Sequence, residues 1–164
     1  MRRAEREAAY SAYVAARQTH WRRVAYALCG DWHHAEDLLQ IALTKLYVAW
    51  PKLAIDGRED AYVRQIIVRA NIDEYRRPWR RERIGVEGPE PVAREELAFE
   101  DRSELMDALR DLSPMQRKVV VLRHWLGLSI EETATELKIS AGTVKSHNAR
   151  GLERLQSLIT EESR

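Results

Sequence analysis

The sequence predicts an all-α protein of two small helical domains joined by an acidic, flexible linker, and three observations support this. Apolar residues recur at helical spacing along most of the 164 residues, and no stretch of useful length alternates as a β-strand would. Helix start and stop signals separate these periodic stretches. Residues 84–104 hold seven acidic and two basic residues, with two glycines and two prolines among them. We therefore expect domains at residues 5–83 and 105–164, with a linker over 84–104.

Three helices are expected in the first domain, over residues 5–29, 33–50 and 61–77. Pro51 should end the second helix, because proline inside a helix removes a hydrogen bond and clashes with the preceding turn. The segment 52–60 is then a loop with a turn signal at Asp56-Gly57. Asp60 is placed to cap the third helix.

An apolar residue on a polar face singles out the second helix as a candidate contact surface. Ile41 shares this face with Asp37, Gln40 and Val48. Single exposed apolar residues are normal in soluble proteins, so incidental exposure is one interpretation. Exposed apolar patches also mark interaction sites, and the flanking residues favour a contact patch for a partner.

An arginine-rich run, Arg76–Arg83, follows the third helix and places five arginines around Trp79. One interpretation is a solvated run of charge at a domain edge. The other is a phosphate clamp, in which each arginine releases counterions from nucleic acid and the tryptophan stacks on a base. We favour the clamp, because a second element typical of DNA-binding proteins lies downstream.

The second domain is expected to hold two helices followed by a helix-turn-helix motif. The first two helices cover residues from about 99 or 102 to 111, and from 114 to 125. Within Leu128–Arg150, Ser129 and Glu132 form a capping box, and Ser140 caps a final helix that runs to about residue 159. A helical hairpin with a solvated outer face is the alternative interpretation.

The final helix has two different faces, which favour DNA binding over the hairpin. Val144, Leu152 and Leu155 form the apolar side, with Asn148 between them. The opposite side carries small hydrogen-bond donors and two guanidinium groups, from Thr143, Ser146, His147, Arg150 and Arg154. A helix of this kind packs through one face and presents the other to a major groove.

Composition narrows the function further. The net charge is only +1, so the whole chain has no strongly basic character. The single cysteine, Cys29, excludes an internal disulfide and fits a reducing cytoplasm. No apolar run is long enough to insert in a membrane. The histidines are scattered, and no phosphate loop, nucleophile motif or metal-ligand spacing is present, so we expect neither an enzyme nor a bound metal or cofactor.

Over about residues 8–160 the sequence resembles the extracytoplasmic-function sigma factors, small two-domain members of the sigma-70 family, and most closely an actinobacterial subgroup. The motifs that carry this resemblance are Gly30-Asp31, Ala35–Gln40, Ala42–Tyr47, Ala61–Asn71, Leu112–Arg117, Leu128–Glu132, Gly142–Ser146 and Ala149–Leu152. The resemblance implies that the chain binds core RNA polymerase and gives it promoter specificity. It also implies that the acidic linker threads the RNA exit path of the polymerase.

The resemblance assigns three sets of residues. The beta-prime clamp of the polymerase would contact Asp37, Leu38, Gln40, Ile41 and Thr44. The minus-ten element, with one extruded base held within Leu53–Asp60, would contact Leu53, Asp56, Asn71, Tyr75, Arg76, Arg77 and Arg80. The minus-thirty-five element would contact Ser140, Thr143, Lys145, Ser146, His147, Arg150 and Arg154. The implied partners are core RNA polymerase, through its beta-prime clamp and beta flap, and promoter DNA, with an anti-sigma factor as a further candidate.

Three residues depart from the pattern of the family. Ile41 stands where many relatives have an acid. Lys138 occupies a turn that often contains glycine, and positive φ costs a non-glycine residue roughly 1 kcal/mol, so another turn geometry is expected. Asn148 replaces an apolar residue and is expected to be partly buried. Lys145 lies at the margin of the DNA-facing side, which suggests a phosphate contact and no base reading.

The competing hypothesis is a helix-turn-helix regulator that binds operator DNA alone, as a dimer on a palindrome. Such a regulator needs an apolar dimer seam, and the sequence offers no separate seam and no ligand domain.

Overall fold

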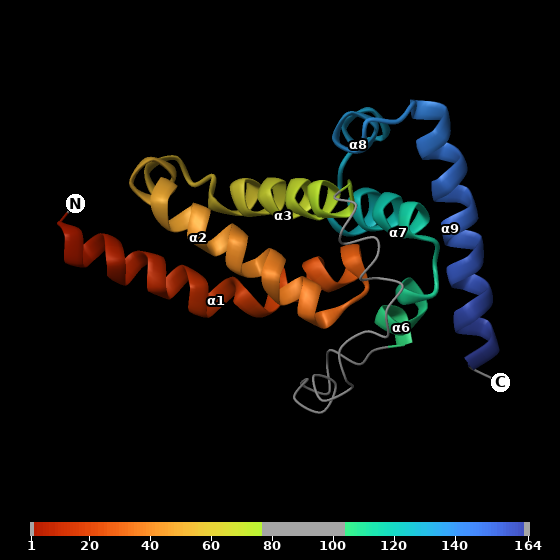
Figure 1. Ribbon diagram of the computed structural model, residues 1–164, viewed down its shortest axis with the longest axis horizontal. Coiled ribbons are helices and arrows are strands. Elements are labelled where there is room, and N and C mark those ends of the chain that lie inside the picture. Colours follow the sequence, from red (N-terminus) through yellow and green to blue (C-terminus); the bar gives the residue numbers. More distant parts are fainter. Residues whose placement is uncertain (1, 77–103, 163–164) are drawn as a thin grey trace. The chain divides into compact units, whose positions relative to one another are not determined.

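The computed structural model describes residues 2–76 and 104–162, and every regular element in these ranges is helical (Figure 1). The helices fall into two compact units, one at each end of the chain. This agrees with the predicted all-α, two-domain architecture. The predicted linker, residues 84–104, lies outside the described residues except for its last one.

Three helices form the first unit: α1 (Arg3–Cys29), α2 (Trp32–Asp56) and α3 (Glu59–Arg76). Leucine, valine and isoleucine side chains from all three helices are fully buried between them, among them Val24, Leu39, Leu46, Val63 and Ile67. Aromatic residues close the bundle near the start of α1, where Tyr10 packs edge-on against Trp50 with 5.6 Å between the ring centroids. The Tyr10 hydroxyl also donates a 2.7 Å hydrogen bond to the Leu43 carbonyl, which ties α1 to α2.

The junction between α2 and α3 differs from the prediction. The α2 helix continues through Pro51 to Asp56, so most of the expected loop 52–60 is helical. Pro51 lacks only its own N–H, and the buried Trp50 and half-buried Leu53 hold the helix to the core on either side of it. The turn is short: Gly57 has φ +67° and donates its N–H to the Leu53 carbonyl at 3.1 Å.

The second unit contains α6 (Glu104–Arg110), α7 (Pro114–Val120), the π-helical turn η2 (Val121–Trp125), α8 (Ile130–Leu137) and α9 (Ala141–Glu162). Ser113 caps α7 as predicted, accepting a hydrogen bond from the Gln116 N–H at 3.3 Å. The core is built from apolar residues on every helix, including Met106, Val119, Leu122, Leu137 and Val144.

Both predicted caps of the helix-turn-helix motif are confirmed. Ser129 and Glu132 form a reciprocal capping box at the start of α8, with two hydrogen bonds of 3.0 Å. At the start of α9 the Ser140 hydroxyl accepts the Thr143 N–H at 3.1 Å. Each cap satisfies helix N–H groups that have no partner within the helix.

The turn between α8 and α9 does not change its geometry to accommodate lysine, contrary to our expectation. Lys138 adopts φ 56° and ψ 46°, the left-handed conformation in which glycine is usual. Its N–H and that of Ile139 both point to the Ala134 carbonyl, and these bonds close the turn. The backbone of the turn therefore has the geometry that glycine would adopt, although the side chain of Lys138 disfavours this conformation.

A glycine sets the close approach of α9 to α7. Gly151 is buried, and a Cβ atom added to it would lie 2.6 Å from Cγ2 of Val120. A Cβ atom on Gly142, in the first turn of α9, would meet nothing closer than the Ser140 Oγ at 3.9 Å. The two glycines of α9 thus differ sharply in the space around them.

Gly151→Ala should destabilise the second unit by about 1–2 kcal/mol, because overpacking against Val120 outweighs the higher helix propensity of alanine. Gly142→Ala is the matched control and should stabilise α9 by roughly 0.5–1 kcal/mol. Hydrogen exchange of the α9 amides in the full chain measures both changes. Equal protection in the two variants would contradict the close approach.

Lys138→Gly should increase protection of the α8 and α9 amides by an amount equivalent to about 0.5–1 kcal/mol. Glycine removes the strain of the left-handed conformation, and part of this gain is offset by its greater freedom in the unfolded chain. Lys138→Ala keeps the strain and serves as the control. An equal gain in both variants would indicate an effect of the lost charge instead.

Candidate nucleic-acid and protein interfaces

The outward face of α9 carries most of the side chains predicted to contact DNA. Lys145, Ser146, Arg150 and Arg154 are exposed. Neither of the two arginines forms an ion pair within the described parts of the chain. Guanidinium groups without an acidic partner remain available for phosphates or for the edge of guanine.

Three further residues of this predicted set are less accessible or already used. Thr143 is half-buried, and its hydroxyl lies 2.8 Å from the Ser140 hydroxyl. His147 is half-buried, and its Nδ1 atom is buried without a hydrogen-bond partner. The exposed Ser140 therefore shapes the first turn of α9 as its cap, and the exposed polar side chains that make no hydrogen bond within the described residues begin with Lys145.

The packing face of α9 was predicted only in part. Val144 and Leu155 are buried, and Asn148 is half-buried with its Oδ1 2.9 Å from Nε2 of His124. This contact gives a polar partner to an asparagine at a position that the family pattern would make apolar. Leu152 was expected on the same face and is 40% exposed, because the buried stripe passes through Gly151 instead.

The candidate protein-contact face of α2 is present with one correction. Asp37, Gln40 and Thr44 are exposed and Ile41 is half-buried. Leu38 is fully buried, with 0% of its surface exposed, so the prediction that it belongs to the contact surface is wrong. Leu38 follows Asp37 by about 100° around the helix axis, which turns its side chain to the core side of the helix.

The predicted minus-ten set is only partly described. Leu53 is half-buried and Asp56 is exposed, and both lie on the last turns of α2 instead of in a loop. Asn71 is 5% exposed, which contradicts a direct contact with DNA in this conformation. Tyr75 and Arg76 belong to the last turn of α3, and Arg77 and Arg80 lie outside the described residues.

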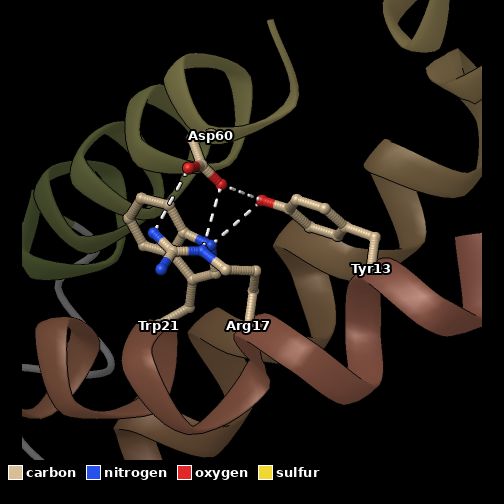
Figure 2. A network of polar contacts seen from close by, with 4 residues as sticks. All are labelled: Tyr13, Arg17, Trp21 and Asp60. Atoms are coloured by element: carbon tan, nitrogen blue, oxygen red, sulfur yellow. Dashed lines mark hydrogen bonds and ion pairs between the residues drawn. The ribbon is translucent and has the colours of Figure 1, made fainter. Parts of the chain in front are cut away.

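Sequence reasoning missed a polar network that holds the start of α3 against α1 (Figure 2). The Tyr13 hydroxyl donates to Oδ1 of Asp60 at 2.6 Å, and the Trp21 indole N–H donates to the Tyr13 oxygen at 3.1 Å. Arg17 forms an ion pair with Asp60, with 3.2 Å between its NH2 and Oδ2. Asp60 was predicted to cap α3, but the helix begins at Glu59 and the carboxylate bonds to α1 instead.

The protonated hydroxyl of Tyr13 and the positive charge of Arg17 both complement the negative charge of the Asp60 carboxylate. Burial and the hydrogen bond to Asp60 raise the pKa of Tyr13, so its hydroxyl stays protonated and acts as the donor. The Arg17 guanidinium also lies 5.5 Å from the centre of the Trp21 ring. The spacing of Tyr13, Arg17 and Trp21, four residues apart on one face of a helix, was the one signal in the sequence.

The part of the chain that the structure describes offers neither a metal site nor a membrane-spanning helix. No group of three or more metal-ligating side chains is positioned to hold an ion there. No described helix is long and apolar enough to cross a membrane.

Both units match family models. Residues 13–81 match the model described as Sigma-70 region 2, and residues 102–155 match that described as Sigma-70, region 4. The chain is 42% identical over 151 residues to the RNA polymerase sigma-E factor of Streptomyces coelicolor, which covers 90% of this chain and 84% of that protein. It is 30% identical over 152 residues to the ECF RNA polymerase sigma factor SigE of Mycolicibacterium smegmatis, over 86% of this chain and 58% of that protein.

A solved structure shares the fold. The sigma factor RpoE of Bartonella quintana, crystallised with the anti-sigma factor NepR, aligns with a TM-score of 0.63 at 24% identity, over 92% of this chain and 96% of that one. Together with the two matched regions and the Streptomyces relative, this places the chain by sequence and by fold. The chain belongs to the extracytoplasmic-function group of the sigma-70 family, which are transcription initiation factors and not enzymes.

Proposed function

We propose that this sigma factor binds core RNA polymerase and directs initiation by reading a minus-thirty-five element with α9 and a minus-ten element with the region around α3. The observation that carries the proposal is the exposed basic face of α9 beside a capped helix-turn-helix turn, in a chain that matches both sigma regions. In this function the chain works in the cytoplasm, where bacterial polymerase and DNA are found.

Base reading on the minus-thirty-five element falls mainly to Arg150 and Ser146. Both are exposed on the outward face of α9, and arginine makes the commonest specific contact with guanine. Lys145 and Arg154 are assigned to phosphates, which position the helix without reading sequence. The half-buried His147 has a smaller role.

Core polymerase binding falls to the exposed face of α2. Asp37, Gln40 and Thr44 supply polar contacts, and the half-buried Ile41 supplies an apolar one to the beta-prime clamp. Leu38 supports this face from below. A second contact, between the α6–α9 unit and the beta flap, is part of the same proposal.

The minus-ten element is assigned to Leu53 and Asp56 at the end of α2 and to Tyr75, Arg76, Arg77 and Arg80 at and beyond the end of α3. Asn71 is left out of this set, because its side chain is buried. An anti-sigma factor stays a candidate partner. The alternative of an independent dimeric regulator has no observation in its favour.

Purified protein added to core polymerase should give promoter-specific transcripts, and Thr44→Arg should weaken core binding by about tenfold or more. The arginine places a bulky charge in the centre of the contact face of α2. Thr19→Arg is the matched control, the same change at an exposed site on α1, and should bind like the wild type. Tight operator binding without any association with polymerase would instead support the regulator.

Arg150→Ala should cost about 1–3 kcal/mol on the preferred promoter and relax the preference at one base pair. Lys145→Ala should weaken binding to all sequences alike and reduce the salt slope by about one. Holoenzyme binding to a library of minus-thirty-five sequences at several salt concentrations measures both. A uniform loss for Arg150→Ala, or a changed base preference for Lys145→Ala, would reverse the two assignments.

A further inference from the structure

We propose that Tyr13, Arg17 and Trp21 are positioning residues for promoter opening, which act through Asp60 to hold the start of α3 in the position that captures the unpaired minus-ten strand. The inference rests on the proposed function and adds to it a determinant on α1, a helix to which none of the predicted contacts was assigned.

The geometry converges on a single carboxylate. Tyr13, Arg17 and Trp21 lie on successive turns of α1 and face the first turn of α3, where Asp60 binds the first two of them (Figure 2). Tyr13 donates to Oδ1, while Arg17 reaches Oδ1 with its Nε at 3.3 Å and Oδ2 with a terminal nitrogen at 3.2 Å. Trp21, itself buried, donates to the Tyr13 oxygen and fixes its direction.

The network lies beside the segment that the proposed function assigns to DNA. Asp60 follows the turn at Gly57 by three residues, and Asp56 and Arg58 flank that turn and pair with each other at 2.8 Å. Since only two residues separate α2 from α3, the position of Asp60 constrains the direction in which this turn projects.

The fold does not depend on the network alone. Further along α3, Val63 and Ile67 are fully buried and hold the helix in the core. The side chains of Arg17 and Asp60 are 35% and 57% exposed, so their ion pair adds little to overall stability. Loss of the network should therefore loosen the first turn of α3 and leave the bundle folded.

A matched hydroxyl lies one turn earlier on α1. Tyr10 donates to the Leu43 carbonyl and thereby ties α1 to α2, and its ring contacts in the described residues are also with α2. Tyr10→Phe removes a hydrogen bond between α1 and α2. Tyr13→Phe removes the hydrogen bond between α1 and α3 together with the acceptor of the Trp21 N–H, so only this second variant concerns the junction. A purely structural role predicts the same behaviour for both variants.

The test compares Tyr13→Phe, Asp60→Asn, the double variant and Tyr10→Phe in the full chain with core polymerase. A promoter that the wild-type holoenzyme transcribes is converted into a fork-junction probe with a single-stranded minus-ten strand and into a duplex probe with the minus-thirty-five element alone. Binding to each probe, core affinity and thermal unfolding are measured, and opening of the duplex promoter is followed by permanganate reactivity of unpaired thymines.

We expect Tyr13→Phe and Asp60→Asn to weaken fork-junction binding and slow opening by about five- to tenfold, the size of one lost hydrogen bond at a partly exposed site. Core affinity and duplex binding should stay within about twofold. The double variant should be less impaired than the sum of the two single ones, because the contact between Tyr13 and Asp60 is shared by both substitutions. Tyr10→Phe should match the wild type on the fork junction despite a similar loss of thermal stability.

Three results would overturn the inference. They are equal fork-junction defects in Tyr13→Phe and Tyr10→Phe, additive defects in the double variant, or tighter fork-junction binding by Asp60→Asn, which would show that Asp60 acts only by repelling phosphate. If the wild-type protein gave no promoter-specific transcripts with core polymerase, the proposed function itself would fail, and the two failures are thus distinguishable.

Discussion

The close packing of α9 on α7 decides which side chains of the DNA-facing helix point outward. Gly151 lets the two backbones approach each other closely. Val144 lies on the same stripe of α9 as Gly151 and Asn148, and it is also buried. Once this stripe faces the core, Ser146 and Arg150 must face away from it, since they lie on the far side of the helix. The close approach that Gly151 permits thus helps to determine which side chains of α9 are exposed.

The first unit meets a similar constraint with aromatic residues. In this bundle α1 packs against both α2 and α3. Two tyrosines on neighbouring turns of α1 each provide a hydrogen bond to one of these helices. Tyr10 reaches a carbonyl of α2, and Tyr13 reaches a carboxylate of α3. A phenol suits this role because its ring packs in the core while its hydroxyl finds a partner at the edge.

Residues whose role depends on local chemistry were predicted well. Ser129, Ser140 and Ser113 are caps in the structure, because a capping hydroxyl bonds to N–H groups within one helical turn of itself. The exposed face of α9 was predicted from periodicity for the same reason. Its assignment to DNA, in contrast, came from the resemblance and stays a proposal.

Residues whose role depends on distant partners were predicted poorly. Asp60 carries the local signal of a cap, yet its partners lie 43 and 47 residues away on α1. Pro51 carries the signal of a helix end, yet the packing of its neighbours outweighs it. Leu38 was expected at a contact surface and is buried, whereas Leu152 was expected on the packing face and is exposed. A helical wheel gives the width of an apolar stripe but does not show which element covers it.

These features bear on how a small sigma factor reads a promoter in the proposed function. Few exposed groups on α9 are suited to base reading, so the minus-thirty-five contact alone supplies modest affinity. Core polymerase binds both units and turns the second DNA contact into an intramolecular one, whose strength then depends on effective concentration and on geometry. Effective concentration helps only if each reader is held in a productive orientation. In the holoenzyme, rigid placement of the α2–α3 junction by Asp60 therefore contributes more to promoter binding than its small contribution to the stability of the fold suggests.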